Sequence, residues 1–174
     1  LVVDPGTKGV ANAVVWVKGV RGGPERLEAT VDQRGCQFVP HVALLTPGGR
    51  LRVLNPDQMV HNVHAWSTAP GNPNANFSFT KQRRQATYPP EGAFAKTEFV
   101  RVTCDVHDWM GMWVAVVENG FAAVTDAEGR FTILGLAPGT YALGVWHETL
   151  AREPVDRPVT LGPDGAELSI PLSP

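Results

Sequence analysis

The chain consists of short apolar runs separated by glycine and proline turns, and this pattern leaves little room for long helices. Runs at 13–17, 50–55, 97–103, 113–117 and 140–146 have the apolar content or the period-two alternation of β-strands. Turn clusters such as "TPGG", "DAEG", "APG" and "GPDG" lie between the runs. With 18 glycines and 15 prolines, almost a fifth of the 174 residues interrupts regular structure. The sequence therefore predicts an all-β fold, with antiparallel sandwiches favoured.

Charge and hydropathy exclude two classes of partner. The formal net charge is −2 and the pI is near 6.2, so no basic footprint for nucleic acid is present. No run of about 18 apolar residues exists, and we expect no transmembrane segment. The chain begins at Leu1 without a charged and then apolar leader, so any signal peptide is expected to have been removed already.

The stretch "VTCDVHDWMGMW" at 102–113 carries the chemistry. Cys104, His107 and Met110 stand three residues apart, and a thiol, an imidazole and a thioether together suit a copper ion. The same spacing would also fit one face of a helical turn, with Met110 filling a gap in the core. The segment "HNVH" at 61–64, which follows a strand ending at Asn55, supplies a further imidazole from a distant part of the chain.

The order of these motifs over about residues 27–117 resembles the cupredoxins of the amicyanin and plastocyanin kind, and the short ligand loop is most similar to that of amicyanin. The resemblance implies a Greek-key β-sandwich over 26–117, with His61, Cys104 and His107 as equatorial copper ligands and Met110 as the weak axial ligand. Asn62 is then expected to tie the two ligand loops together.

The function that this resemblance implies is electron transfer rather than catalysis. Copper alternating between Cu(II) and Cu(I) would pass one electron between redox partners such as a cytochrome or an oxidoreductase, outside the cytoplasm and most simply in the periplasm. Four apolar residues near the ligands, Met59, Val60, Val106 and Trp109, are expected to form a collar for such a partner. Asp105 and Asp108 occupy positions where the amicyanin kind tends to have proline, which suggests a partner with basic residues.

Cys36 and His41, in "CQFVPHV", do not fit a simple copper site. Cys36 could be a spectator thiol beside the site, an extra copper ligand, or a disulfide partner of Cys104. Together with His41, Cys104 and His107 it also forms a Cys2His2 set suited to structural zinc. A packed, hydrogen-bonded role is favoured for His41. A second functional hypothesis is a copper-binding or delivery module, in which Cys36, Met59, Met112 and the extra histidines hold Cu(I).

The end of the chain predicts a separate small domain. Residues 123–146 are expected to form a meander of three strands and two turns. Their pattern resembles the carboxypeptidase regulatory-like (transthyretin-like) β-sandwich, through Asp126, Gly129, Phe131, Leu136, Pro138, Gly139 and Tyr141. Residues 1–25 are similar to its first strands and 118–174 to its remainder. The copper domain is thus expected to be inserted into a sandwich built from both ends of the chain. His64 and His147 are expected to have packing or surface roles.

Overall fold

The computed structural model describes residues 3–80 and 84–172, and all regular structure in these residues is β-strand. The predicted all-β class is therefore confirmed. The described residues contain no helix that is long and apolar enough to cross a membrane. Backbone contacts divide the chain into two compact units: unit 1 is Leu1–Pro24 with Asn119–Pro174, and unit 2 is Glu25–Glu118. The assignment of 1–25 and 118–174 to one domain and of 26–117 to another stays a prediction.

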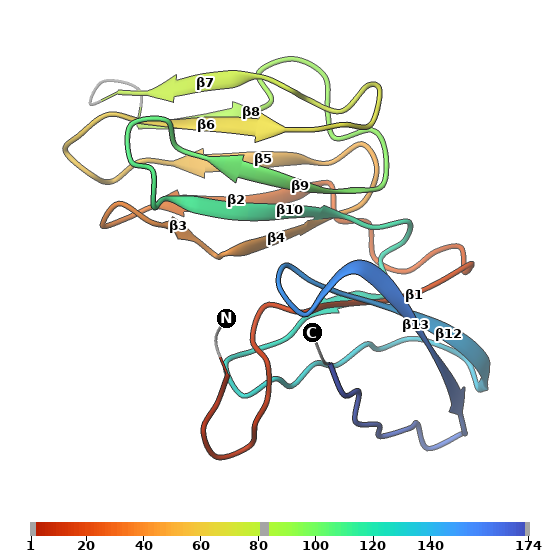
Figure 1. Ribbon diagram of the computed structural model, residues 1–174. Helices are drawn as coiled ribbons and strands as arrows, with labels where there is room; N and C mark the ends of the chain where they lie inside the picture. Colours follow the sequence, from red (N-terminus) through yellow and green to blue (C-terminus); the bar gives the residue numbers. More distant parts are fainter. Residues whose placement is uncertain (1–2, 81–83, 173–174) are drawn as a thin grey trace. The chain divides into compact units, whose positions relative to one another are not determined.

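Unit 2 contains two sheets, seen as two layers of ribbon in Figure 1. The five-stranded sheet has the order β4-β10-β9-β6-β7, and the four-stranded sheet has the order β3-β2-β5-β8. The pairs β4/β10 and β2/β5 are parallel, and the other pairs are antiparallel. The bounds are β2 Glu28–Gln33, β3 Phe38–Val39, β4 Val42–Leu45, β5 Arg50–Leu54, β6 His61–Trp66, β7 Asn76–Phe79, β8 Gln85–Tyr88, β9 Glu98–Thr103 and β10 Gly111–Val116.

The core of unit 2 lies between these two sheets and is made by the alternate residues of their strands. Leu51 and Val53 of β5, Val100 and Val102 of β9, and Met112 of β10 are all inaccessible to solvent. The period-two pattern read from the sequence thus has a physical cause, because one face of each strand faces the opposite sheet. Met112, expected to help hold Cu(I) in a delivery module, is a residue of this core.

Unit 1 contains one four-stranded antiparallel sheet of order β11-β1-β12-β13. Its strands are β1 Val14–Val17, β11 Ala122–Val124, β12 Gly139–His147 and β13 Ala151–Leu161. The segment 131–136 packs Phe131, Ile133 and Leu136 against this sheet. It makes no ladder, so the middle strand expected within the 123–146 meander is wrong. Alternating apolar side chains do not by themselves supply a paired strand edge.

The turn motif of unit 1 has a clear geometric basis. The Asp126 carboxylate accepts hydrogen bonds from the backbone amides of Glu128 (3.0 Å) and Arg130 (2.8 Å). Gly129 has φ +78°, and a Cβ there would meet the backbone of Gly9. Tyr141 donates its hydroxyl to the carbonyl of Ala137 at 2.8 Å. These contacts account for the "DxxG" and "PGxY" pattern as turn chemistry.

Candidate metal centre

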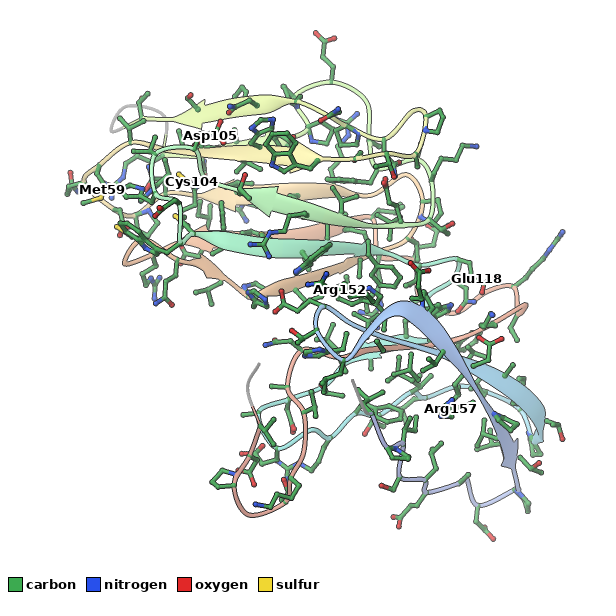
Figure 2. The ribbon with its side chains drawn as sticks, viewed as in Figure 1. Met59, Cys104, Asp105, Glu118, Arg152 and Arg157 are labelled. Carbon is green, nitrogen blue, oxygen red and sulfur yellow. The ribbon has the colours of Figure 1, made fainter. Side chains whose placement is uncertain are left out.

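The predicted metal ligands meet at one end of the unit 2 sandwich, where several strands begin or end. His61 is the first residue of β6, and Cys104 follows the last residue of β9. His107 and Met110 lie in the loop 104–110 that leads into β10. Figure 2 shows Cys104 and Met59 at this end of the unit.

His61 is fully buried and has a fixed orientation. Its Nε2 lies 2.9 Å from Oδ2 of Asp57, whose carboxylate also accepts the backbone amides of Gly35 and Cys36, each at 3.0 Å. Burial opposes ionisation of Asp57, but the hydrogen bonds from Cys36, Gly35 and His61 outweigh it and lower the pKa of this carboxyl. An ionised Asp57 only accepts, so His61 donates through Nε2. In the neutral ring Nδ1 then carries the lone pair, and a metal can bind there.

That lone pair faces a second imidazole and a thiol. The Nδ1 atoms of His61 and His107 are 3.1 Å apart, and Sγ of Cys104 lies 3.7 Å from Nδ1 of His107. An ion with usual bond lengths of about 2.0 Å to nitrogen and 2.3 Å to sulfur would see a His61–M–His107 angle of about 100° and a His107–M–Cys104 angle of about 120°. Each of these two separations therefore allows one ion to be shared by that pair of donors.

The ligand loop is closed by its own backbone. The amide of Cys104 donates to the carbonyl of Met110, and the amide of Met110 donates to the carbonyl of His107, both at 3.0 Å. The loop contains a turn but no helix, and Met110 fills part of the core, as the alternative for this residue expected. Cys104 and Met110 are 2% and 1% exposed and belong to the core between the sheets. Three of the predicted ligands are thus held on one short, closed segment.

Asn62 links β6 to this loop. Its Oδ1 accepts the backbone amide of Asp105 at 2.6 Å, and its Nδ2 donates to Oδ1 of Asn76 at 2.6 Å. The backbone amide of Asn62 donates to Sγ of Cys104 at 3.5 Å. Asn62 therefore contacts both segments that carry the predicted ligands.

Cys36 also approaches the histidine pair. Its Sγ and one ring nitrogen each of His61 and His107 lie within 4.8 Å of one another. Cys104 is outside this tight group of three, although its Sγ is 3.7 Å from His107 Nδ1. The structure therefore contains a Cys/His/His cluster that could bind a metal, with a second thiol beside it. Both cysteines are free, so the disulfide alternative is not realised.

The remaining histidines have other surroundings. His41 is not in the metal-capable group that the described residues form, so the Cys2His2 zinc set is not assembled, and its carbonyl accepts the amide of Trp113 at 2.9 Å. His64 contacts the Asp105 carboxylate at 3.0 Å and stacks on Trp66. The ring of His147 accepts the amides of Thr149 and Leu150 through Nδ1.

Sequence reasoning missed Asp57 as the residue that orients His61. Its signal was weak: an aspartate four residues before a predicted histidine ligand, in a loop where aspartate is common for turn reasons alone. Only the fold brings the amides of Gly35 and Cys36 to the same carboxylate.

Comparisons with known proteins add fold-level likeness. No protein family profile matches the chain, and no curated protein matches it. Among solved structures, the oxidised state of an amicyanin point mutant is 19% identical, with a TM-score of 0.42, over 52% of this chain and 83% of that one. A purple cupredoxin from Nitrosopumilus maritimus is 15% identical, with a TM-score of 0.41, over 51% and 99%. A copper-containing nitrite reductase (NirK) from Thermus scotoductus SA-01 is 20% identical, with a TM-score of 0.45, over 68% of this chain and 27% of that one.

Proposed function

We propose that unit 2 is a mononuclear copper domain that carries one electron between redox partners. The observation that supports this most directly is the arrangement of two imidazole Nδ1 atoms 3.1 Å apart with the Cys104 sulfur 3.7 Å from one of them. Two imidazoles and a thiolate in a trigonal set, with a weak axial thioether, are the ligands that make copper an electron carrier. His61, Cys104 and His107 are the equatorial ligands in this proposal, and Met110 is the axial one.

The surroundings of the ligands support a site whose geometry changes little between oxidation states. Asp57 holds the ring of His61, and Asn62 holds the backbone beside Cys104. Backbone hydrogen bonds close the loop that carries Cys104, His107 and Met110. Donors fixed in this way need little rearrangement when the charge of the bound ion changes by one.

Exposed apolar side chains near the proposed ligands offer a surface at which the electron can pass to a partner. Met59 and Val60 are each 43% exposed, Val106 is 57% exposed and Trp109 is 67% exposed, although side chains of this kind are usually buried. The ring centroid of Trp109 lies 5.3 Å from that of His107. A small apolar surface beside a ligand suits a transient redox partner. The exposed Asp105 and Asp108 favour a partner with basic residues.

The same proposal places the protein outside the cytoplasm, most simply in the periplasm. Soft copper sites with thiolate ligands are readily used away from the reducing cytoplasm. The proposal includes no enzymatic turnover. Unit 1 is proposed to be a carboxypeptidase regulatory-like domain, supported by the turn contacts of Asp126, Gly129 and Tyr141.

A Cu(II) titration of metal-free protein, followed by visible absorption, tests the proposal. One equivalent should produce an intense thiolate-to-copper band that persists in Cys36→Ser and disappears in Cys104→Ser. If the band is absent from wild type, or survives in Cys104→Ser, the proposed electron-transfer centre is wrong. Unchanged thermal unfolding of the metal-free variants would show that the loss is not a folding defect.

A second candidate function is Cu(I) binding and delivery. The observation that favours it is the approach of Cys36 Sγ to Met59 Sδ at 3.4 Å. Loss of copper to a modest chelator after reduction would support delivery over electron transfer. Retention of the metal through repeated reduction and oxidation would support electron transfer.

A further inference from the structure

We propose that Cys36 and Met59 form a second copper position, selective for Cu(I), at the solvent-exposed edge of the histidine pair. Sγ of Cys36 and Sδ of Met59 are 3.4 Å apart, close enough for one ion to contact both sulfurs. One ring nitrogen each of His61 and His107 lies within 4.8 Å of the Cys36 sulfur and of each other. A thiolate, a thioether and an imidazole thus converge from three separate loops.

The donor types select the oxidation state. Thiolate and thioether sulfurs are soft ligands, and soft ligands suit Cu(I) better than Cu(II). When Cu(I) binds, it replaces the proton of the Cys36 thiol, and this proton passes to water. Copper remains Cu(I) throughout. No oxidant or reductant is needed at this position.

Hydrogen bonds fix the backbone of Cys36 and Met59 in the metal-free protein. Cys36 has φ +55°, in the left-handed region that non-glycine residues rarely adopt. Asp57 accepts its amide, and the indole of Trp109 donates to its carbonyl at 3.2 Å. Asn55 donates to the carbonyl of Met59 at 3.0 Å. A left-handed backbone at Cys36 that two side chains hold indicates a position with a use.

Accessibility distinguishes this position from the proposed inner centre, on which the inference rests. His61, Cys104 and Met110 are at most 2% exposed, but Met59 is 43% exposed and Cys36 is partly exposed. An ion from solvent or from another protein therefore meets the outer sulfurs before the inner thiolate. The shared histidine pair lets it move inward by ligand exchange, in which the bond to Cys36 breaks as the bond to Cys104 forms, and the proton of the Cys104 thiol passes through water to the Cys36 thiolate.

The test removes the inner thiolate and asks whether Cu(I) still binds. Metal-free Cys104→Ser protein is titrated with Cu(I) against a chromogenic Cu(I) chelator. It should retain one Cu(I), and the double variant Cys36→Ser/Cys104→Ser should bind on the order of 100-fold more weakly. In the Cys104→Ser background, Met59→Leu should lower the affinity for Cu(I) about 10-fold. Met112→Leu should leave that affinity unchanged, since Met112 is a buried thioether of the core. Equal affinity of the single and double cysteine variants would overturn the proposal.

A second measurement uses Cys104→Ser protein, in which the ion cannot move on to the inner thiolate. Cu(I) should slow the alkylation of Cys36 by iodoacetamide, mapped by mass spectrometry, and an unchanged rate would also overturn the outer position. The two proposals fail separately. A visible Cu(II) band without Cys36-dependent Cu(I) binding removes only the outer position. Cys36-dependent Cu(I) binding without the band removes the electron-transfer centre and leaves a Cu(I) carrier.

Discussion

The two ends of unit 2 are tied by the same kinds of side chain but to different effect. At one end, the Asp57 carboxylate accepts the amides of Gly35 and Cys36 and contacts His61. At the other, the Glu98 carboxylate accepts the amides of Thr68 and Ala69 at 2.6 Å and 3.1 Å, and the side-chain amide of Asn72. Strand β9 joins the two ends, because Glu98 begins it and Cys104 follows it.

The difference lies in the third partner of each carboxylate. Asn72 ends its chain of contacts on the backbone of Lys96, through Nδ2 and Oδ1. His61 instead has a second ring nitrogen, which faces His107 at 3.1 Å. The Glu98 carboxylate binds amide and hydroxyl groups and stabilises a loop. The Asp57 carboxylate also contacts a histidine ring and can orient it as a metal ligand. The same local chemistry is therefore structural at one end and, in our proposal, part of a metal centre at the other.

The largest expected effect comes from removing the first imidazole. His61→Gln should weaken Cu(II) binding by at least about 100-fold and abolish the intense visible band, because Gln offers no nitrogen lone pair of comparable strength. The measurement is Cu(II) affinity by competition, together with the absorption spectrum. His64→Gln is the matched control, since His64 contacts Asp105 and Trp66 rather than the cluster. Similar losses in both variants would contradict the ligand assignment.

Asp57→Asn should have the next largest effect. The Asn amide can donate to Nε2 of His61, which would place the ring proton on Nδ1 and block the ligand atom. We expect a loss of Cu(II) affinity of about 10- to 100-fold. Glu98→Gln, the equivalent change at the other end, should leave copper affinity unchanged. The comparison between the two ends fails if both amide variants bind copper like wild type.

Much of the fold of unit 2 was predictable because its cause is local. Alternating apolar residues in "RLRVLN" and "TEFVRVT" predict strands wherever one face must be buried, and β5 and β9 lie there. The segment 131–136 shows the limit of that reasoning. Phe131 and Ile133 are partly buried, but pairing needs a neighbouring strand edge that the sequence does not reveal.

The candidate site divides in the same way. The spacing of Cys104, His107 and Met110 within one loop could be read directly, because the backbone itself sets their separation. Asp57 and the contact between Cys36 and Met59 could not be read, since they depend on loops brought together by three-dimensional pairing. The ambiguity between Cys36 and His41 in "CQFVPHV" was likewise resolved only by position: Cys36 faces the histidine pair and His41 does not join it.

Asn62→Ala and Asn72→Ala compare the two ends of unit 2 through their asparagines. Asn62→Ala removes hydrogen bonds to Asp105 and Asn76 from a residue that is 3% exposed, which should lower the free energy of unfolding by about 1 to 3 kcal/mol. It should also broaden the copper spectrum, because the loop carrying Cys104 loses its tie to β6. Asn72→Ala should destabilise the metal-free protein through lost contacts to Lys96 and Glu98 but leave the spectrum unaltered. Urea unfolding and absorption of both variants separate the two roles, and a changed spectrum in Asn72→Ala would contradict them.

The smallest expected effect is the acid dependence contributed by Glu98. Burial alone would raise the pKa of this carboxyl, but hydrogen bonds from Asn72, Thr68 and Ala69 lower it below its ordinary value of 4.5. A carboxyl with a folded-state pKa below the unfolded value stabilises the fold above about pH 4.5, and the contribution is lost as the pH falls through the folded value. Glu98→Gln should therefore cost about 1 kcal/mol at pH 7 in urea unfolding of metal-free protein, a figure reduced for the partial exposure of this group. The gap between variant and wild type should narrow towards pH 3. A constant difference in the free energy of unfolding across this range would mean that Glu98 acts through the shape of its side chain rather than its charge. The carboxylates of Glu98 and Asp57 would then stabilise their ends of unit 2 by different means.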